Sequence, residues 1–192
     1  MDGKIKISID VMGGENSPDK TLEGISLFVK RYQNKDDYFF YLFGDVDQIN
    51  QKIKKFSNLK SNYKIIDTKI VVADDLSALS AIKKGKNSSM WECINSQISY
   101  NSDVSLSAGN TGVLLVMSKM ILKTLEGIDK PALAGLWPNN KNMNVVLDLG
   151  ANVECNDKNL VDFSEMGSAL YKSIFPNDEP KVALLNIGLE EI

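Results

Sequence analysis

A run of small and polar residues, Ser107-Ala-Gly-Asn-Thr-Gly112, stands between two apolar segments. The pattern predicts a strand over 103–106, a tight loop, and a helix over 113–125. The first turn of a helix leaves backbone N–H groups unpaired, and the helix dipole adds partial positive charge there. Such a loop can bind a phosphate or a polarised carbonyl oxygen. A turn that needs glycine only for its backbone angles would show the same spacing. The run is neither a GxGxxG nor a Walker A sequence, so it predicts no nucleotide.

Two other loops carry groups of the same kind. Asp10 ends a predicted strand and is followed by the paired glycines Gly13 and Gly14. Ligands of open α/β sheets bind at the carboxyl ends of strands, so Asp10 is a candidate ligand residue. A structural role, in which its carboxylate accepts hydrogen bonds from loop N–H groups, fits the same position. Lys86-Asn-Ser-Ser89 opens another predicted helix, with Asn87 or Ser88 as its cap, and offers a second anion site. A solvated loop with a helix cap explains these residues as well.

The lack of histidine and the spacing of the cysteines exclude several kinds of catalytic and metal site. The chain has no histidine, which excludes Ser-His-Asp and Cys-His catalysis within it. Its two cysteines match no zinc spacing and no disulfide framework, and Cys93 is expected to be a buried thiol. We expect no metal and no organic cofactor. The loops still offer carboxylates, carboxamides, hydroxyls and backbone N–H groups. These groups suit a reaction in which bound phosphate is the nucleophile, while the protein positions it and stabilises an oxyanion.

Composition describes an ordinary globular protein of 192 residues with 43% hydrophobic residues. The net charge of −3 makes a nucleic-acid-binding surface unexpected. Arg31 is the only arginine, so anion binding must rely on lysine and backbone N–H groups. The amino terminus runs directly into a strand, so we expect no signal peptide and a reducing cytoplasm. The longest apolar run, Val113–Leu122, is too short to span a bilayer.

These loops must be positioned by the elements around them, and strands and helices alternate along the chain. The expected strands are 4–10, 38–43, 63–66, 70–72, 103–106, 132–136, 144–149 and 181–187. The expected helices are 18–32, 47–56, 77–84, 90–100, 113–125 and 160–175. This order predicts an α/β fold with a mostly parallel sheet and helices on both faces. The loops at 13–14, 74–75, 107–112, 150–155 and 186–191 would then gather along one sheet edge. We expect 1–192 to be the N-terminal part of a single α/β domain that is truncated at its C-terminus.

Seven segments, in order along nearly the whole chain, resemble the bacterial phosphate acyltransferases of phospholipid synthesis, the PlsX family. They are Asp10-Val-Met-Gly-Gly14, Lys86-Asn-Ser-Ser-Met90, Val104-Ser-Leu-Ser-Ala-Gly-Asn-Thr-Gly112, Lys130-Pro-Ala-Leu133, Leu147-Asp-Leu-Gly-Ala-Asn-Val-Glu-Cys155, Met166-Gly-Ser168 and Leu184-Leu-Asn-Ile-Gly188. The resemblance implies a Rossmann-like three-layer α/β/α fold, related to the isocitrate and isopropylmalate dehydrogenases and to phosphotransacetylase.

The resemblance also implies a reaction and its partners. Acyl-[acyl carrier protein] and inorganic phosphate would give acyl phosphate and free carrier protein. The enzyme would be a cytoplasmic homodimer, peripherally associated with the membrane, that supplies a downstream glycerol-3-phosphate acyltransferase. A phosphotransacetylase-like enzyme acting on acyl-CoA remains an alternative, as does a non-catalytic α/β protein that binds phosphate or carrier protein.

Site residues follow from the matched motifs. We expect Asn110 and the N–H groups of Thr111 and Gly112 to stabilise the oxyanion, and Asp148 and Asn152 to orient the loops or the phosphate. Phosphate is expected among Asp10, Gly13, Gly14, Lys84, Lys86, Ser88, Ser89, Ser107, Gly109 and Gly112. The chain departs from the family pattern at Glu15-Asn16, where Asp-His is common, at Lys83-Lys84, where arginines are common, and at Asn159, where histidine is common.

Overall fold

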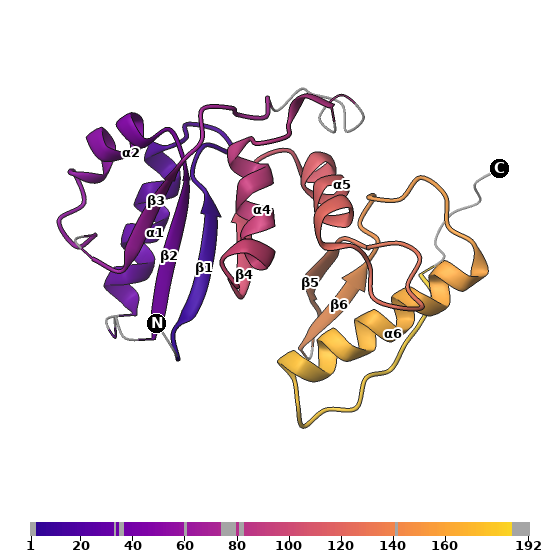
Figure 1. Cartoon of the computed structure of the whole chain (residues 1–192). Coiled ribbons are helices and arrows are strands. Elements are labelled where there is room, and N and C mark those ends of the chain that lie inside the picture. The colour runs from indigo at the N-terminus through magenta and orange to yellow at the C-terminus, as the bar shows by residue number, and fades with distance from the viewer. Residues whose placement is uncertain are drawn as a thin grey trace. The chain divides into compact units, whose positions relative to one another are not determined.

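The structure is a computed structural model that describes residues 3–32, 34, 37–59, 61–73, 80, 83–140 and 142–185. The chain divides into two compact units, Met1–Lys123 and Thr124–Ile192, and each is described by itself (Figure 1). The first unit contains β1 (Ile5–Asp10), α1 (Asp19–Arg31), β2 (Tyr38–Gly44), α2 (Val46–Ile53), β3 (Tyr63–Asp67), α4 (Ser89–Ser99), β4 (Val104–Ser107) and α5 (Thr111–Leu122).

The first unit is built on a four-stranded parallel sheet with the strand order β3-β2-β1-β4. Strand β2 is apolar throughout because both of its faces are covered. Phe40 and Leu42 pack into the core cluster that contains α1 and α2, while Tyr41 and Phe43 pack with Cys93 of α4 on the other face. Helix α5 in turn packs against α4. The predicted mostly parallel sheet flanked by helices is thereby confirmed.

Helix α1 follows the predicted amphipathic pattern but begins differently. Leu22 and Ile25 are buried in the core between the helix and the sheet. The sequence predicts Ser17 as the helix cap with Pro18 in the first turn, and this is wrong, since Pro18 occupies the cap position and provides no side-chain bond. The Ser17 hydroxyl instead donates to the carbonyl of Gly13 at 2.6 Å. Ser17 therefore fastens the loop after β1 rather than the start of the helix.

The second unit contains β5 (Ala134–Pro138), β6 (Met143–Leu147) and α6 (Asp157–Ile174). The two strands pair with each other in antiparallel fashion, and α6 packs against β6. They form a separate two-stranded sheet. Their pairing is antiparallel because a connection of a few residues allows only an antiparallel pair, whereas a parallel pair needs a dozen or more. Residues 181–185 form no strand, although a strand is predicted there. The predicted loops at 74–75 and 186–191 lie outside the described residues.

The described helices are all too short or too polar to cross a membrane. The predicted helix over 77–84 falls mostly outside the described residues, and only 80, 83 and 84 can be placed in helical backbone.

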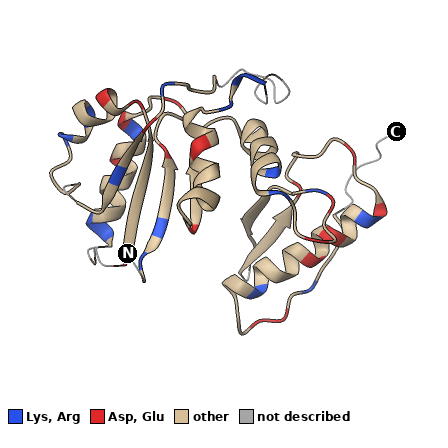
Figure 2. Cartoon of the chain, viewed as in Figure 1, with Lys and Arg blue, Asp and Glu red and all other residues tan. Residues whose placement is uncertain are grey.

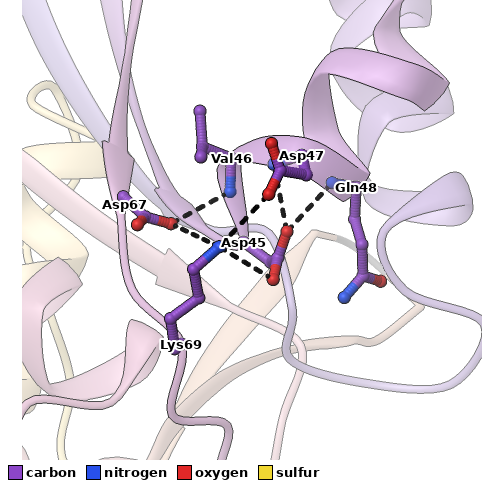
Figure 3. A network of polar contacts seen from close by, with 6 residues as sticks. All are labelled: Asp45, Val46, Asp47, Gln48, Asp67 and Lys69. Carbon is purple, nitrogen blue, oxygen red and sulfur yellow. Dashed lines mark hydrogen bonds and ion pairs between the residues drawn. The ribbon is translucent and has the colours of Figure 1, made fainter.

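Asp45 connects the carboxyl ends of β2 and β3 (Figure 3). Its Oδ1 atom accepts hydrogen bonds from the backbone N–H groups of Asp47 and Gln48, both at 3.0 Å, which caps α2. The Lys69 ammonium lies 3.2 Å from Asp45 and 3.3 Å from Asp67. The Gln48 N–H and then Lys69 lower the pKa of Asp45 below its ordinary value of 3.8.

We expect Asp45→Ala to lower the melting temperature of the first unit by roughly a few degrees, because the helix loses its cap. Asp47→Ala is the matched control, since the Asp47 side chain is exposed and only ion-paired. The folded pKa of Asp45 is depressed, so its stabilisation is present above pH 3.8 and disappears as the pH falls through the folded pKa. The gap between wild type and Asp45→Ala should therefore shrink in thermal scans below pH 3.8. An unchanged gap would contradict the ionic part of this account.

Candidate functional site

Asp10 joins the loop after β1 to the loop after β4. It pairs in register with Ser107 at the carboxyl ends of these neighbouring strands. Its Oδ1 atom accepts from the N–H groups of Met12 at 3.3 Å and Gly13 at 3.1 Å. Its Oδ2 atom accepts from the Ser107 hydroxyl at 2.7 Å, and the Ser107 oxygen accepts from the Gly109 N–H at 3.1 Å. One buried carboxylate thus fixes the loop after β1 and the loop after β4.

Asp10 is 2% exposed, and this burial affects its charge. Burial raises the pKa of Asp10 above 3.8, while hydrogen bonds from Ser89, Ser107 and the loop N–H groups act in the opposite direction. The Ser89 hydroxyl influences Asp10, yet it has no hydrogen-bond partner of normal geometry among the described residues. The structural role considered for Asp10 from the sequence is therefore observed. Its role as a phosphate ligand stays a prediction.

Glycine is required where these two loops touch. A β-carbon on Gly13 would lie 2.4 Å from Asp10 Oδ2 and 2.8 Å from the Ser107 oxygen. Gly14 has a φ of +88°, and a β-carbon there would lie 2.7 Å from the carbonyl oxygen of Ala108. The two loops pack backbone to backbone, which leaves no space for side chains at either glycine.

The loop after β4 ends in the first turn of α5. Asn110 caps the helix, with its Oδ1 accepting from the Val113 N–H at 3.0 Å. The N–H groups of Thr111 and Gly112 precede the first intrahelical bond, which the Leu114 N–H donates to the Asn110 carbonyl. N–H groups at this position have no intrahelical acceptor. The helix has no acidic residue in its first turn, and its one charged residue, Lys119, lies in its last turn (Figure 2). These two N–H groups are suited to an anion.

The start of α4 is brought next to Asp10, although its serines are not exposed. Ser88 is the helix cap, as predicted among the alternatives, and accepts from the Trp91 N–H at 3.2 Å. Ser88 and Ser89 are both buried. Lys84 and Lys86 are exposed. Phosphate binding by these four residues stays a prediction.

Asp148 and Asn152 lie in the second unit, where they are hydrogen-bonded to each other. The Asp148 Oδ1 atom accepts from the backbone N–H of Asn152 at 3.2 Å and from its side-chain amide at 2.9 Å. The same amide donates to the carbonyl of Pro131 at 3.0 Å, and the Cys155 thiol donates to Asp148 Oδ2 at 3.3 Å. This arrangement orients the loop after β6.

The buried thiol expected at Cys93 is confirmed. Cys93 is 1% exposed, and its burial, followed by the charge of Asp10, raises its pKa to about 12. A thiol with that pKa is inert at neutral pH. Among the described residues, no group of three or more carboxylates and cysteines is arranged to hold a metal ion.

Lys20 is not singled out by any sequence motif, yet it lines a cavity that also contacts Asp10 and Ser107. Glu15, where the chain departs from the family pattern, lines the same cavity. Lys20 lies in the first turn of α1. Its position one turn beyond the glycine loop is the only sequence signal that could have indicated it.

Fold and site together define an α/β protein with a glycine-containing loop that leads into the start of a helix. Residues 5–192 match the family described as "Fatty acid synthesis protein". The chain belongs to this family.

Curated relatives of this chain carry the name phosphate acyltransferase. The protein of Pelagibacter ubique is 54% identical over 188 residues, which cover 98% of this chain and 55% of the relative. The protein of Rhodospirillum rubrum is 40% identical over 190 residues, covering 99% of this chain and 54% of the relative. The chain therefore spans about half the length of these relatives.

A solved structure has a similar fold. The EutD phosphotransacetylase from Staphylococcus aureus superposes with a TM-score of 0.57 over 90% of this chain and 54% of that chain. The two sequences are 14% identical, so the similarity concerns the fold alone.

We expect Gly13→Ala to destabilise the first unit by about 1–3 kcal/mol, because the new methyl group must displace Asp10 or Ser107. Gly24→Ala is the matched control, since a β-carbon at Gly24 meets nothing within 4 Å. Urea unfolding would be followed by the fluorescence of Trp91 in a Trp137→Phe background, so that the signal reports on the first unit. Equal unfolding midpoints for Gly13→Ala and Gly24→Ala would refute the tight packing of the two loops.

Proposed function

We propose that the protein is a phosphate acyltransferase that transfers an acyl group from acyl carrier protein to inorganic phosphate. A phosphate oxygen attacks the thioester carbonyl, the new C–O bond forms and the C–S bond breaks. The products are acyl phosphate and the free carrier thiol. The leaving thiolate takes up the proton that the attacking phosphate loses. The names of the relatives support this reaction, and the absence of histidine fits it, because phosphate needs no strong protein base.

One observation carries the proposal. The N–H groups of Thr111 and Gly112 begin an uncharged helix turn, and the Asp10–Ser107 bond fixes the loop that leads to them. Fixed donors of this kind stabilise negative charge that develops in a transition state. They suit both a bound phosphate and the oxyanion of the tetrahedral intermediate.

Other groups take supporting roles in the proposal. The Asn110 side chain stabilises the oxyanion with a hydrogen bond from its amide nitrogen, because its Oδ1 atom already caps α5. Asp148 and Asn152 hold the loop after β6 in the shape that the reaction requires. Lys84, Lys86, Ser88 and Ser89 contribute to phosphate binding from the start of α4 and the segment before it. The reaction requires no metal and no organic cofactor.

The proposal also covers the oligomeric state of the protein, its cellular location and the enzyme that receives its product. We expect a homodimer that acts in the cytoplasm, associates peripherally with the membrane and passes acyl phosphate to a glycerol-3-phosphate acyltransferase. Leu125, Trp137 and Val153 of the second unit have large exposed apolar side chains, which is what contact with another surface would require.

The test is an incubation of the protein, with any further residues that its gene encodes, with long-chain acyl-[acyl carrier protein] and phosphate. Hydroxylamine traps the acyl phosphate, and free carrier thiol is counted. Phosphate-dependent release of one thiol per trapped acyl group is the expected result. Release from acyl-CoA alone would identify the alternative enzyme, and phosphate binding without release would identify a binding protein.

Asn110→Ser separates the proposed catalytic role of Asn110 from its role as a helix cap. Serine still caps the helix but lacks the amide donor, so we expect kcat to fall about 100-fold or more while the melting temperature changes little. Asn110→Asp keeps the cap and adds a negative charge, which should raise the KM for phosphate. Steady-state kinetics measure both effects. Wild-type kcat in Asn110→Ser would rule out the amide as an oxyanion donor.

A further inference from the structure

A cavity of about 430 Å³ opens beside the Asp10–Ser107 pair in the first unit. It runs between the sheet and α1, so β1 and β4 form one wall and the helix forms the other. Small-molecule sites commonly have volumes of this size, with apolar walls and a few polar groups. The apolar lining residues are Ile7, Ile9, Ile25, Phe28, Phe40 and Leu106.

The polarity of the cavity changes from one end to the other. Asp10 and Ser107 lie at the carboxyl ends of their strands, and Lys20 lies in the first turn of α1 at the same end. Farther from this edge the wall is formed by aliphatic and aromatic side chains, down to Phe28 two helical turns later. The eight steps along the helix from Lys20 to Phe28 correspond to about 12 Å. This is the shape of a site for a ligand with a polar head and a long apolar tail.

Leu106 provides a second indication. It pairs with Ile9 in the sheet, so the two side chains point to the same face. Ile9 is 7% exposed because α1 covers it, whereas Leu106 is 50% exposed beside it. A large apolar side chain on the inner wall of a cavity, half uncovered, is what a bound apolar chain would cover.

We infer that this cavity binds the acyl chain of the substrate, with the thioester carbonyl at the Asp10–Ser107 end. The inference rests on the proposed function, since it names where that reaction places its fatty tail. The carbonyl then lies at the same sheet edge as the loop that carries the Thr111 and Gly112 donors. The cavity therefore selects substrates by the length of their acyl chain.

Gly24 is the position that tests this selection. Lys20, Gly24 and Phe28 are spaced by four residues, so they share one row of α1 along the cavity. A β-carbon at Gly24 would meet no atom within 4 Å. A larger side chain can therefore be introduced there without a clash, and it would take space from a bound chain halfway along the cavity.

The experiment compares wild type, Gly24→Ala and Gly24→Leu, using the whole protein and acyl carrier proteins loaded with chains of increasing length. In wild type, kcat/KM should rise about fourfold per added methylene until the cavity is filled. Gly24→Leu should keep wild-type activity on short chains and lose more than about tenfold on long ones. Gly24→Ala should show a smaller loss on long chains than Gly24→Leu, because it adds less volume to the cavity.

The outcomes separate this inference from the proposed function. Phosphate-dependent turnover with the same chain-length profile in wild type and Gly24→Leu would overturn the inference and leave the acyltransferase reaction intact. No turnover by wild type with any chain would overturn the reaction itself.

A second measurement does not depend on turnover. A fatty acyl carrier protein with a diazirine at the chain end should label peptides that contain Phe28 or Ile7 on irradiation. Labelling confined to residues outside the first unit would overturn the inference, even if every Gly24 variant were inactive.

Discussion

The buried carboxylate of Asp10 is the interaction on which the candidate site depends. It accepts hydrogen bonds from its own loop and from Ser107, the residue that pairs with it on the neighbouring strand. Because Ser107 in turn accepts from the Gly109 N–H, the position of Asp10 determines the path of the chain into α5. The cost of burying this carboxylate is visible in its raised pKa. The parallel sheet and the close contact of two glycine-rich loops make that burial possible.

The second unit uses a similar solution at the end of β6. Asp148 follows the strand, and its carboxylate accepts hydrogen bonds from Asn152 in the small-residue loop beyond it. In both units a carboxylate at the end of a strand organises a loop that contains glycine. Loops of this type can bring backbone N–H groups close to an anion, because nothing projects between them and the ligand.

The chemistry and the architecture agree with each other. The first unit offers fixed N–H donors and a cavity that becomes apolar away from them, whereas its one cysteine is buried and has a pKa of about 12. The Cys93 thiol is therefore not a nucleophile at neutral pH, and the described part of the site offers hydrogen-bond donors instead. Such a site can position a nucleophile and an electrophile that arrive as substrates, which is the division of labour expected when phosphate attacks a thioester.

Local sequence patterns were sufficient to predict most of the elements and several of their ends. Strand β2 could be predicted because a continuous apolar run is expected when both faces of a strand are covered, and α5 because small polar residues stop a strand before an apolar helix. The Ser88 cap was among the predicted alternatives for the same local reason. The family could be recognised because its motifs are contiguous stretches of sequence.

Which of these residues come into contact depends on the tertiary structure. The bond between Asp10 and Ser107 joins residues 97 positions apart, and no periodicity encodes that contact. Three other features were likewise not predicted. They are the antiparallel pairing of β5 with β6, the hydrogen bond from the Ser17 hydroxyl to the Gly13 carbonyl, and the cavity beside Lys20. Local pattern specifies what a segment becomes, whereas strand register and packing between elements depend on contacts that form only when distant segments come together.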